Sequence, residues 1–320
     1  MPDAGTRLPG VGAVDVVAAD VGAADVGAAD VGAADVEVGP VRLRVVRSGR
    51  GVGDDAPAEP VVLINGIFMN TATWAGLEAE LAPRYQVVRY DGRGQGESSK
   101  PEGPYTVAQH TDDLEGLLDA LDLGPVHLVG LSNGALAALE LAGRRPELLR
   151  SLTIMDGFGR VDALMRAVLR SWRAALALGG TGGRFDVATP WVWGHSFLED
   201  NEAWLLSLRE EAAAADPRPV LALVDGALAY GEEGRECVSA LRRYRGPLLT
   251  LVGAQDVLSP PRYSLELLTA AGRGSLVMVQ RAGHAAPIER PAAVAAELRS
   301  FFDRVREGAT ERAGAQAEGA

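Results

Sequence analysis

The most informative stretch of this chain reads Val126-His127-Leu128-Val129-Gly130-Leu131-Ser132-Asn133-Gly134-Ala135-Leu136-Ala137-Ala138-Leu139-Glu140-Leu141. It begins with an apolar run of strand length, passes through a turn with two glycines, and continues as an Ala- and Leu-rich segment of helical composition. The pattern predicts a strand, a sharp turn and a helix. A serine at such a turn is displayed above the edge of the sheet, because the flanking glycines let strand and helix pass close to it.

The hydroxyl of Ser132 is therefore the candidate nucleophile. The backbone N–H of Asn133 follows it at the predicted helix N-terminus, where unpaired donors can stabilise a developing negative charge. A Gly-x-Ser-x-Gly pattern is expected by chance roughly 0.2 times in a chain that has 39 glycines among 320 residues. The predicted strand before it and the predicted helix after it make the pattern more specific. The rest of the chain can therefore be searched for the base and the acid that Ser132 would need.

Composition indicates a globular protein. Hydrophobic residues make up 47% of the chain and charged residues 23%, which suits one large α/β domain or a core with an inserted subdomain. The formal net charge of -12 argues against nucleic acid as a partner. The single cysteine, Cys237, excludes an internal disulfide and a cysteine-cluster metal site. No signal peptide pattern and no run near the ~18 apolar residues of a membrane span is present, so we expect a cytoplasmic protein.

Residues 15–36 repeat with a period of five. Aspartate recurs at positions 15, 20, 25, 30 and 35, each followed by valine. This period gives no constant face on a helix or a strand. We therefore predict that residues 1–39 form an acidic, disordered, low-complexity extension. A pentapeptide-repeat β-helix is the alternative, but such folds need many more stacked units.

Strand and helix patterns alternate along the rest of the chain. Besides the strand before Ser132, strands are predicted at 41–46, 61–64, 86–90, 149–155, 248–252 and 275–280, and helices at 71–81, 106–121, 263–271 and 291–306. This alternation predicts an α/β fold with a mostly parallel sheet and helices on both faces.

Between residues 158 and 245 only helical periodicity is found. This segment holds four of the five tryptophans and is broken by a glycine-rich turn at 179–183 and by Pro190. The expected organisation is thus a core of residues 40–157 and 246–306, an all-helical insertion at 158–245, and a flexible tail at 307–320.

A serine hydroxyl needs a base, and histidine, with a reference pKa of about 6.5, is the usual one. His284 is the candidate because it follows a predicted strand in a glycine-flanked loop, at the end of the sheet where Ser132 is displayed. His110 and His127 lie within a helix and a strand, where packing or surface roles are expected. His195 lies in the helical insertion and is a candidate for lining the pocket.

An acid must orient the base and stabilise its charged form. Asp256 ends the strand that precedes the His284 strand, and the chain order Ser132, Asp256, His284 is the one expected of this arrangement. Asp156, which also ends a strand, is the alternative acid. A second N–H donor for the oxyanion is expected in Asn65-Gly66-Ile67-Phe68, from Ile67 or Phe68.

The chain from Val41 to Arg306 resembles the α/β-hydrolase superfamily. The resemblance rests on Asn65-Gly66, Asp91-x-Arg93-Gly94-x-Gly96-x-Ser98, Gly130-x-Ser132-x-Gly134, Gly253-x-x-Asp256-x-x-x-Pro260, and Gly283-His284 with Glu289 and Pro291. It implies a nucleophile at Ser132, an acid at Asp256, a base at His284, oxyanion amides at Ile67 and Asn133, and a helical cap formed by the insertion. Asn-Gly stands where most relatives have His-Gly, and this form is similar to that of acyl-transferring relatives.

These observations predict a serine hydrolase, a monomer or homodimer, that cleaves a carboxylic ester, lactone or thioester with an apolar acyl part. Asn65, Phe68, Trp193 and His195 are the candidate substrate-binding residues, and no metal or organic cofactor is implied. The apolar substrate is inferred from the tryptophans of the insertion, although these side chains would also serve simply to pack its helices. Acyl transfer to an alcohol is the alternative reaction. A ligand receptor without catalysis is a further alternative that the same fold allows.

Overall fold

The computed structural model describes residues 16–19, 32–52, 58–233 and 237–318. Within these ranges the strands form a nine-stranded sheet in the order β1-β9-β8-β7-β6-β4-β5-β3-β2. The bounds are β1 Val16–Ala19, β2 Ala33–Val38, β3 Val41–Gly49, β4 Pro60–Ile64, β5 Gln86–Tyr90, β6 Val126–Leu131, β7 Leu149–Met155, β8 Leu248–Gly253 and β9 Ser275–Val279. Every pairing from β1 to β5 is parallel, and β3 and β2 pair antiparallel at one edge. The predicted α/β fold class is confirmed.

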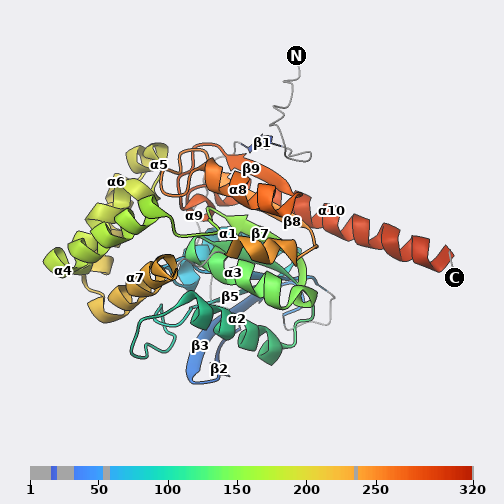
Figure 1. Ribbon diagram of the computed structural model, residues 1–320, viewed down its shortest axis with the longest axis horizontal. Helices are drawn as coiled ribbons and strands as arrows, with labels where there is room; N and C mark the ends of the chain where they lie inside the picture. The colour runs from blue at the N-terminus through green and yellow to red at the C-terminus, as the bar shows by residue number, and fades with distance from the viewer. Residues whose placement is uncertain (1–15, 20–31, 53–57, 234–236, 319–320) are drawn as a thin grey trace, which may run out of the picture.

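Helices cover both faces of this sheet (Figure 1). They are η1 Thr71–Trp74, α1 Ala75–Leu81, α2 Val107–Leu121, α3 Asn133–Arg144, η2 Pro146–Leu148, α4 Ala163–Val192, α5 His195–Asp200, α6 Glu202–Ala213, α7 Pro217–Glu232, η3 Cys237–Arg242, α8 Pro261–Ala271, α9 Ala286–Glu289 and α10 Pro291–Glu318. One apolar core joins the sheet to α2, α3 and α8, and a second joins the other face to α1 and α10. Burial of these two surfaces fixes the sheet between its helices.

The helix α2 shows how the apolar pattern produces this packing. Leu114, Leu117 and Leu118 are buried in the first core, and Leu121 packs against it, so the predicted stripe faces the sheet. Thr106 caps the helix, since its hydroxyl oxygen accepts a hydrogen bond from the backbone N–H of Gln109.

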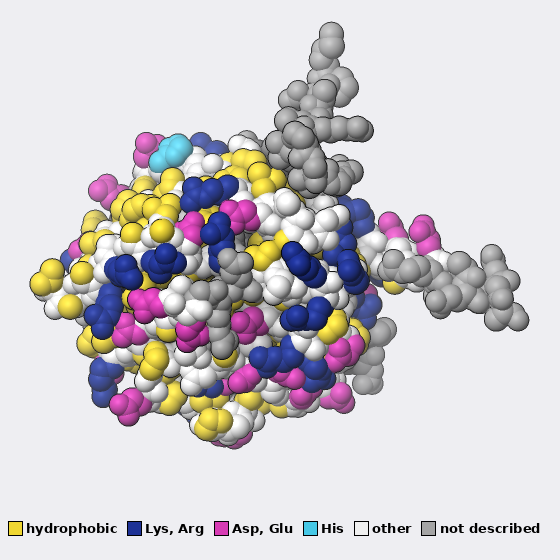
Figure 2. Space-filling view, viewed as in Figure 1, with side chains coloured by type: hydrophobic (Ala, Val, Ile, Leu, Met, Phe, Trp, Pro, Cys, Tyr) yellow, Lys and Arg dark blue, Asp and Glu magenta, His cyan; other side chains and the backbone are white. Residues whose placement is uncertain are grey.

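The segment between β7 and β8 is helical in its described residues, as predicted. Helices α4 to α7 lie together on one side of the sheet, at the left of Figure 1. The predicted break at 179–183 corresponds to a kink inside α4, where Gly180 has φ 65° and ψ -164°. The break predicted at Pro190 is wrong, because this residue lies in the last turn of α4. Side chains of α4 and α6 also supply most of the large exposed apolar groups, and yellow side chains gather over this region in Figure 2.

Two predictions about the chain ends need correction. Ala33–Val38, expected to be disordered, forms β2 by antiparallel pairing with β3, and Val36 and Val38 pack against the first core. Val16–Ala19, also expected to be disordered, forms β1 and pairs parallel with β9. Most of the remaining repeat lies outside the described residues. The tail expected to be flexible from Glu307 instead continues α10 to Glu318, and this helix extends beyond the body of the molecule in Figure 1.

Candidate active site

The turn between β6 and α3 has the strained geometry that the sequence predicts. Ser132 has φ 54° and ψ -117°, a region that residues other than glycine rarely adopt. A Cβ atom on Gly130 would lie 2.7 Å from the carbonyl oxygen of Gly134, and one on Gly134 would lie 2.5 Å from the carbonyl oxygen of Asn65. Only glycine therefore fits on either side, and the Ser132 hydroxyl is presented at the mouth of the turn.

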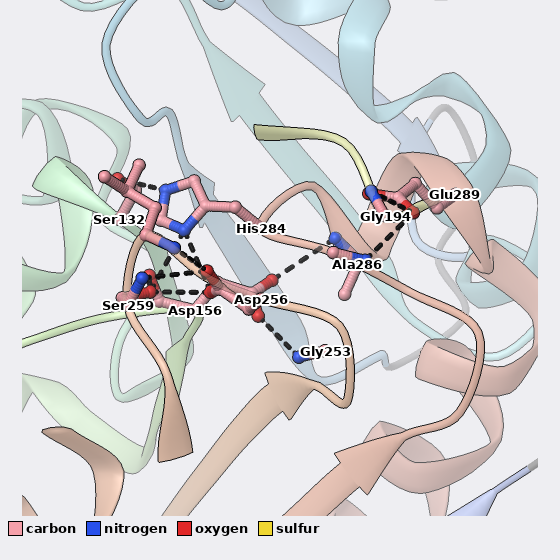
Figure 3. Close-up of polar contacts among 11 residues, drawn as sticks. Ser132, Asp156, Gly194, Gly253, Asp256, Ser259, His284, Ala286 and Glu289 are labelled. Carbon is pink, nitrogen blue, oxygen red and sulfur yellow. Dashed lines mark hydrogen bonds and ion pairs between the residues drawn. The ribbon is translucent and has the colours of Figure 1, made fainter. Parts of the chain in front are cut away.

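Three side chains from distant parts of the chain meet at this turn (Figure 3). His284 Nε2 lies 2.8 Å from Ser132 Oγ, and His284 Nδ1 lies 3.0 Å from Asp256 Oδ2. Ser132 follows β6, Asp256 follows β8 and His284 follows β9. Because these strands are parallel, their carboxyl ends lie at one edge of the sheet, and the three side chains are brought together there.

The carboxylate of Asp256 is held by its own loop. Its Oδ1 accepts hydrogen bonds of 2.8 Å from the backbone N–H groups of Leu258 and Ser259. The Ser259 hydroxyl lies 2.7 Å from Asp256 Oδ2 and 3.0 Å from His284 Nδ1. Sequence reasoning missed Ser259. The signal available was its position three residues after Asp256, where aspartate turns often bond to the backbone and side chains that follow.

Asp156, the alternative acid, supports the site through the backbone. Its Oδ1 accepts from the N–H of Gly253 at 2.8 Å and its Oδ2 from the N–H of Ala286 at 3.3 Å. Burial, followed by the nearby charge of Asp256, raises the pKa of Asp156 well above its ordinary value. Asp156 thus joins the loop of Asp256 to the loop of His284, and it is Asp256 that faces the imidazole.

Glu289 joins the His284 loop to the helical insertion. Its Oε2 accepts hydrogen bonds from the N–H of Gly283 at 2.9 Å and from the N–H of Gly194, just beyond α4, at 3.2 Å. Burial raises the pKa of this carboxyl to about 7, although the hydrogen bonds favour its charged form. A second link is the hydrogen bond of 2.8 Å from the His284 N–H to the carbonyl of Val192. The position of the imidazole therefore depends on the packing of α4.

The loop after β4 faces Ser132 from the opposite side. Gln95 Nε2 donates a hydrogen bond of 2.6 Å to the carbonyl of Gly66, which anchors this loop to the glycine-rich segment around Arg93. The N–H groups of Ile67 and Asn133 donate no hydrogen bond to any described residue, and both residues line the cavity above Ser132. Their role as oxyanion donors stays a prediction.

A cavity of about 750 Å³ lies between this edge of the sheet and helices α4, α6 and α7. Its lining includes Ser132 and His284 together with apolar side chains of the insertion, among them Met165, Leu169, Trp172, Trp193 and Trp204. Predicted substrate-binding residues Phe68 and Trp193 belong to this lining.

The other two predicted substrate-binding residues lie elsewhere. Asn65 is buried, and its Oδ1 accepts a hydrogen bond of 2.6 Å from Trp74 Nε1, which turns the side chain away from the cavity. His195 is exposed at the start of α5, with Nε2 3.2 Å from Gln255 Nε2. Neither residue belongs to the lining of this cavity, so their part in substrate binding stays a prediction.

The remaining histidines have structural surroundings. His127 is fully buried in β6, with Nδ1 2.7 Å from Ser151 Oγ, and burial lowers its pKa. Burial, with the charge of Arg93, lowers the pKa of His110 to about 4. Only His284 among the four histidines contacts Ser132 in the described structure.

No group of three or more His, Cys, Asp or Glu side chains in the described ranges has the arrangement of a metal site. Within the same ranges, no helix is both long enough and apolar enough to cross a membrane.

A family model described as the alpha/beta hydrolase fold matches residues 59–291. The chain belongs to the alpha/beta hydrolase family. A candidate carbamate hydrolase, RutD, from Caulobacter vibrioides is 30% identical over 256 residues, which cover 78% of this chain and 93% of that protein. A candidate non-heme bromoperoxidase, BpoC, from Mycobacterium tuberculosis is 29% identical over 265 residues, covering 79% of this chain and 97% of that protein.

Two solved structures are similar to this alpha/beta hydrolase. The enol-lactonase from Burkholderia xenovorans LB400 has a TM-score of 0.74 and 25% identity, with 84% of this chain and 100% of that chain covered. A thermophilic esterase from Thermogutta terrifontis has a TM-score of 0.75 and 25% identity, with 86% and 99% covered. Family and relatives together support hydrolase activity.

Proposed function

We propose that this protein is a serine hydrolase that cleaves a carboxylic ester, lactone or thioester through an acyl-enzyme on Ser132. The observation that carries the proposal is the continuous line of contacts from Ser132 Oγ through His284 to Asp256, with distances of 2.8 Å and 3.0 Å. Nucleophile, base and orienting acid must stand in this relation for a serine to attack a carbonyl carbon. The similar solved structures include an esterase and an enol-lactonase, and these names support cleavage of an ester or lactone bond.

In the proposed reaction, Ser132 Oγ forms a bond to the carbonyl carbon while its proton passes to His284 Nε2. The N–H groups of Ile67 and Asn133 stabilise the negative oxygen of the tetrahedral intermediate. The imidazolium then returns the proton to the leaving oxygen or sulfur, and the carbon–oxygen or carbon–sulfur bond breaks. Water repeats the sequence on the acyl-enzyme and releases the acid. Asp256 keeps the Nδ1–H tautomer of His284, which leaves Nε2 free to accept.

We also propose that the helical segment 158–245 acts as the cap of this site. It contributes most of the large apolar side chains that line the cavity, among them Trp172, Trp193 and Trp204. An apolar lining of this kind favours a substrate with apolar parts and excludes water from the acyl-enzyme.

The test is a panel of p-nitrophenyl esters, lactones, acyl thioesters and aryl carbamates, assayed with wild type and Ser132→Ala. We expect the variant to lose at least ~10³-fold in kcat on the substrates that wild type cleaves. Its melting temperature should stay close to that of wild type, because this half-buried hydroxyl contributes little packing. Equal turnover by wild type and the variant would remove Ser132 from the mechanism.

The same panel with an added alcohol separates hydrolysis from acyl transfer. Hydrolysis predicts the free acid as the main product at every alcohol concentration. A new ester that dominates over the free acid would assign the reaction to the transferases, with the same acyl-enzyme.

A further inference from the structure

Three arginines are buried in the described part of the chain, and Arg184 differs from the other two. Arg89 pairs with Glu78 at 2.6 Å, and Arg93 pairs with Asp113 at 2.6 Å. The Arg184 residue is 7% exposed, but none of the described carboxylates forms an ion pair with it. Its Nε is buried and has no hydrogen-bond partner among the described residues. A buried charge is ordinarily paired, so this guanidinium lacks the partner that its burial demands.

Arg184 lines the same cavity as Ser132 and His284. It lies in the part of α4 that follows the kink at Gly180. This part is held against α6, since the Thr181 hydroxyl donates a hydrogen bond of 3.3 Å to the carbonyl of Ala213. The kink and this contact direct Arg184 toward the cavity instead of toward solvent.

Phe68 contacts the guanidinium but does not replace an anion. The Arg184 Cζ lies 4.1 Å from the centroid of the Phe68 ring. The Phe185 ring is a second, more distant contact, with its centroid 5.9 Å from Cζ. Contact with aromatic rings regains only part of what a guanidinium loses on leaving water. In keeping with this, burial lowers the pKa of Arg184 to about 10.

A second unpaired donor lies beside the same ring. Trp172 is buried, lines the cavity and packs against Phe68, with ring centroids 5.9 Å apart. Its Nε1–H also has no hydrogen-bond partner within the described ranges. Two residues that each carry a buried, unpaired N–H donor thus contact Phe68, which follows the proposed oxyanion residue Ile67.

The charges of the lining favour a ligand with a single negative charge. Arg184 is the only Lys or Arg among the described lining residues, and Glu211 of α6, which is exposed, is the only Asp or Glu. A carboxylate balances one guanidinium and offers two oxygens to its planar donors. A phosphate dianion would leave an uncompensated charge in an apolar cavity.

We propose that Arg184, assisted by Trp172, binds a free carboxylate of the substrate, so that the preferred ester or lactone carries a second, uncleaved carboxyl group. This proposal rests on the proposed hydrolase function, since it names the class of substrate for the same cavity. Arg184 and Trp172 act here as specificity-determining residues, and the carboxylate they bind is separate from the carbonyl that Ser132 attacks.

The test compares matched substrates with and without the extra carboxylate. One series is p-nitrophenyl hydrogen adipate, pimelate and suberate against their neutral methyl esters, with the carboxylate on the acyl side. The other is 4-acetoxybenzoate against methyl 4-acetoxybenzoate, with the carboxylate on the leaving group. The quantity measured is the ratio of kcat/KM for the charged and the neutral member of each pair.

We expect wild type to prefer the charged member in at least one series, and Arg184→Met to lower this ratio by about 30-fold or more. Trp172→Phe keeps an aromatic ring without the N–H and should lower the ratio about 3- to 10-fold. Arg170→Met removes an exposed arginine of the same helix and should leave the ratio unchanged. The melting temperature of Arg184→Met should not fall, because the change removes a buried charge that forms no ion pair with any described residue.

A wild-type ratio below one in both series, or the same ratio in wild type and Arg184→Met, would overturn the carboxylate site. Ser132-dependent cleavage of the neutral esters would then leave the proposed function standing. If neither member of any pair is cleaved, the proposed function fails on these esters. Calorimetry with monomethyl adipate then tests the carboxylate site independently of catalysis. Binding by wild type that Arg184→Met abolishes supports the site, and equal or absent binding rejects it.

Discussion

The hydroxyl oxygen of Ser259 lies 2.7 Å from Oδ2 of Asp256, the carboxylate oxygen that also faces His284 Nδ1. The hydroxyl has one proton to donate, and Asp256 Oδ2 is its nearest acceptor, ahead of the carbonyl of Asp156 at 2.8 Å. Since the backbone already holds Oδ1, Ser259 fixes the second oxygen of the carboxylate. Asp256 is thereby held in the orientation that the imidazole requires.

Ser259→Ala should lower kcat about 10-fold, which corresponds to ~1.4 kcal/mol of lost transition-state stabilisation. The reason is that Asp256 loses one charge-assisted hydrogen bond but keeps its contact with His284. Steady-state kinetics on a cleaved ester measures the effect, with the melting temperature as a check of folding.

Ser264→Ala is the matched control for this variant. Ser264 is a buried serine of α8 whose hydroxyl has no hydrogen-bond partner in the described structure. The control should retain wild-type kcat. An equal loss of kcat in both variants would mean that general packing, and not the contact with Asp256, explains the effect.

The sequence predicted those parts of the site that local pattern determines. Ser132, Asp256 and His284 each follow an apolar run of strand length and have a glycine within three residues, a pattern that marks the end of a strand. Parallel strands place such ends at one edge of the sheet, so three local patterns sufficed to predict one meeting point. Strand bounds at 86–90 and 149–155 were predicted to the residue.

Features that depend on packing between distant segments were not predictable. Nothing in the helical pattern around Arg184 reveals that its side chain is buried. The strand Ala33–Val38 pairs because β3 offers an open edge and Val36 and Val38 meet the first core, whereas its own five-residue period fits no regular structure. His195 is a candidate for lining the pocket because it lies in the helical insertion, but it is exposed at the start of α5.

Glu289 should make stability depend on pH between about 4.5 and 7. Its pKa rises from 4.5 to about 7 on folding, so the folded protein holds this proton more tightly than the unfolded chain does. The stabilisation is complete below pH 4.5 and is lost as the pH rises through about 7. Because Gln keeps an acceptor for Gly194 and Gly283 but never ionises, Glu289→Gln should gain up to about 3 kcal/mol relative to wild type between pH 5 and pH 8.

Melting temperatures of wild type and Glu289→Gln at intervals across this range measure that gain. Asp156, whose pKa is also raised by burial, is present in both proteins, so the difference between the two curves reports on position 289. Glu199→Gln, an exposed carboxyl of α5, is the control and should follow wild type. A difference between wild type and Glu289→Gln that does not change with pH would show that the carboxyl has the same pKa in both states.

Removing one partner of the ion pair between Arg93 and Asp113 should destabilise the protein strongly, whereas replacing both partners by apolar side chains should destabilise it little. The guanidinium donates two hydrogen bonds of 2.6 Å to the carboxylate, and both side chains are buried. Arg93→Met should lower the free energy of unfolding by about 3–5 kcal/mol because it leaves Asp113 buried and unpaired. The double variant Arg93→Met/Asp113→Leu should recover most of this loss in urea unfolding experiments. A double variant less stable than Arg93→Met would contradict this interpretation.

Gly226 of α7 should tolerate no side chain, because a Cβ atom there would lie 1.8 Å from the backbone carbonyl oxygen of Tyr105. This close approach accompanies the hydrogen bond of 3.1 Å from the Tyr105 N–H to the Ala222 carbonyl, which holds α7 against the loop before α2. Gly226→Ala should therefore lower the free energy of unfolding by about 3 kcal/mol or more.

Gly308→Ala is the matched control in α10, where a Cβ atom would meet nothing within 4 Å, and it should raise stability by ~0.5–1 kcal/mol through helix propensity. Urea unfolding of both variants decides the matter, and a Gly226→Ala protein as stable as Gly308→Ala would mean that α7 does not approach this loop as closely as described.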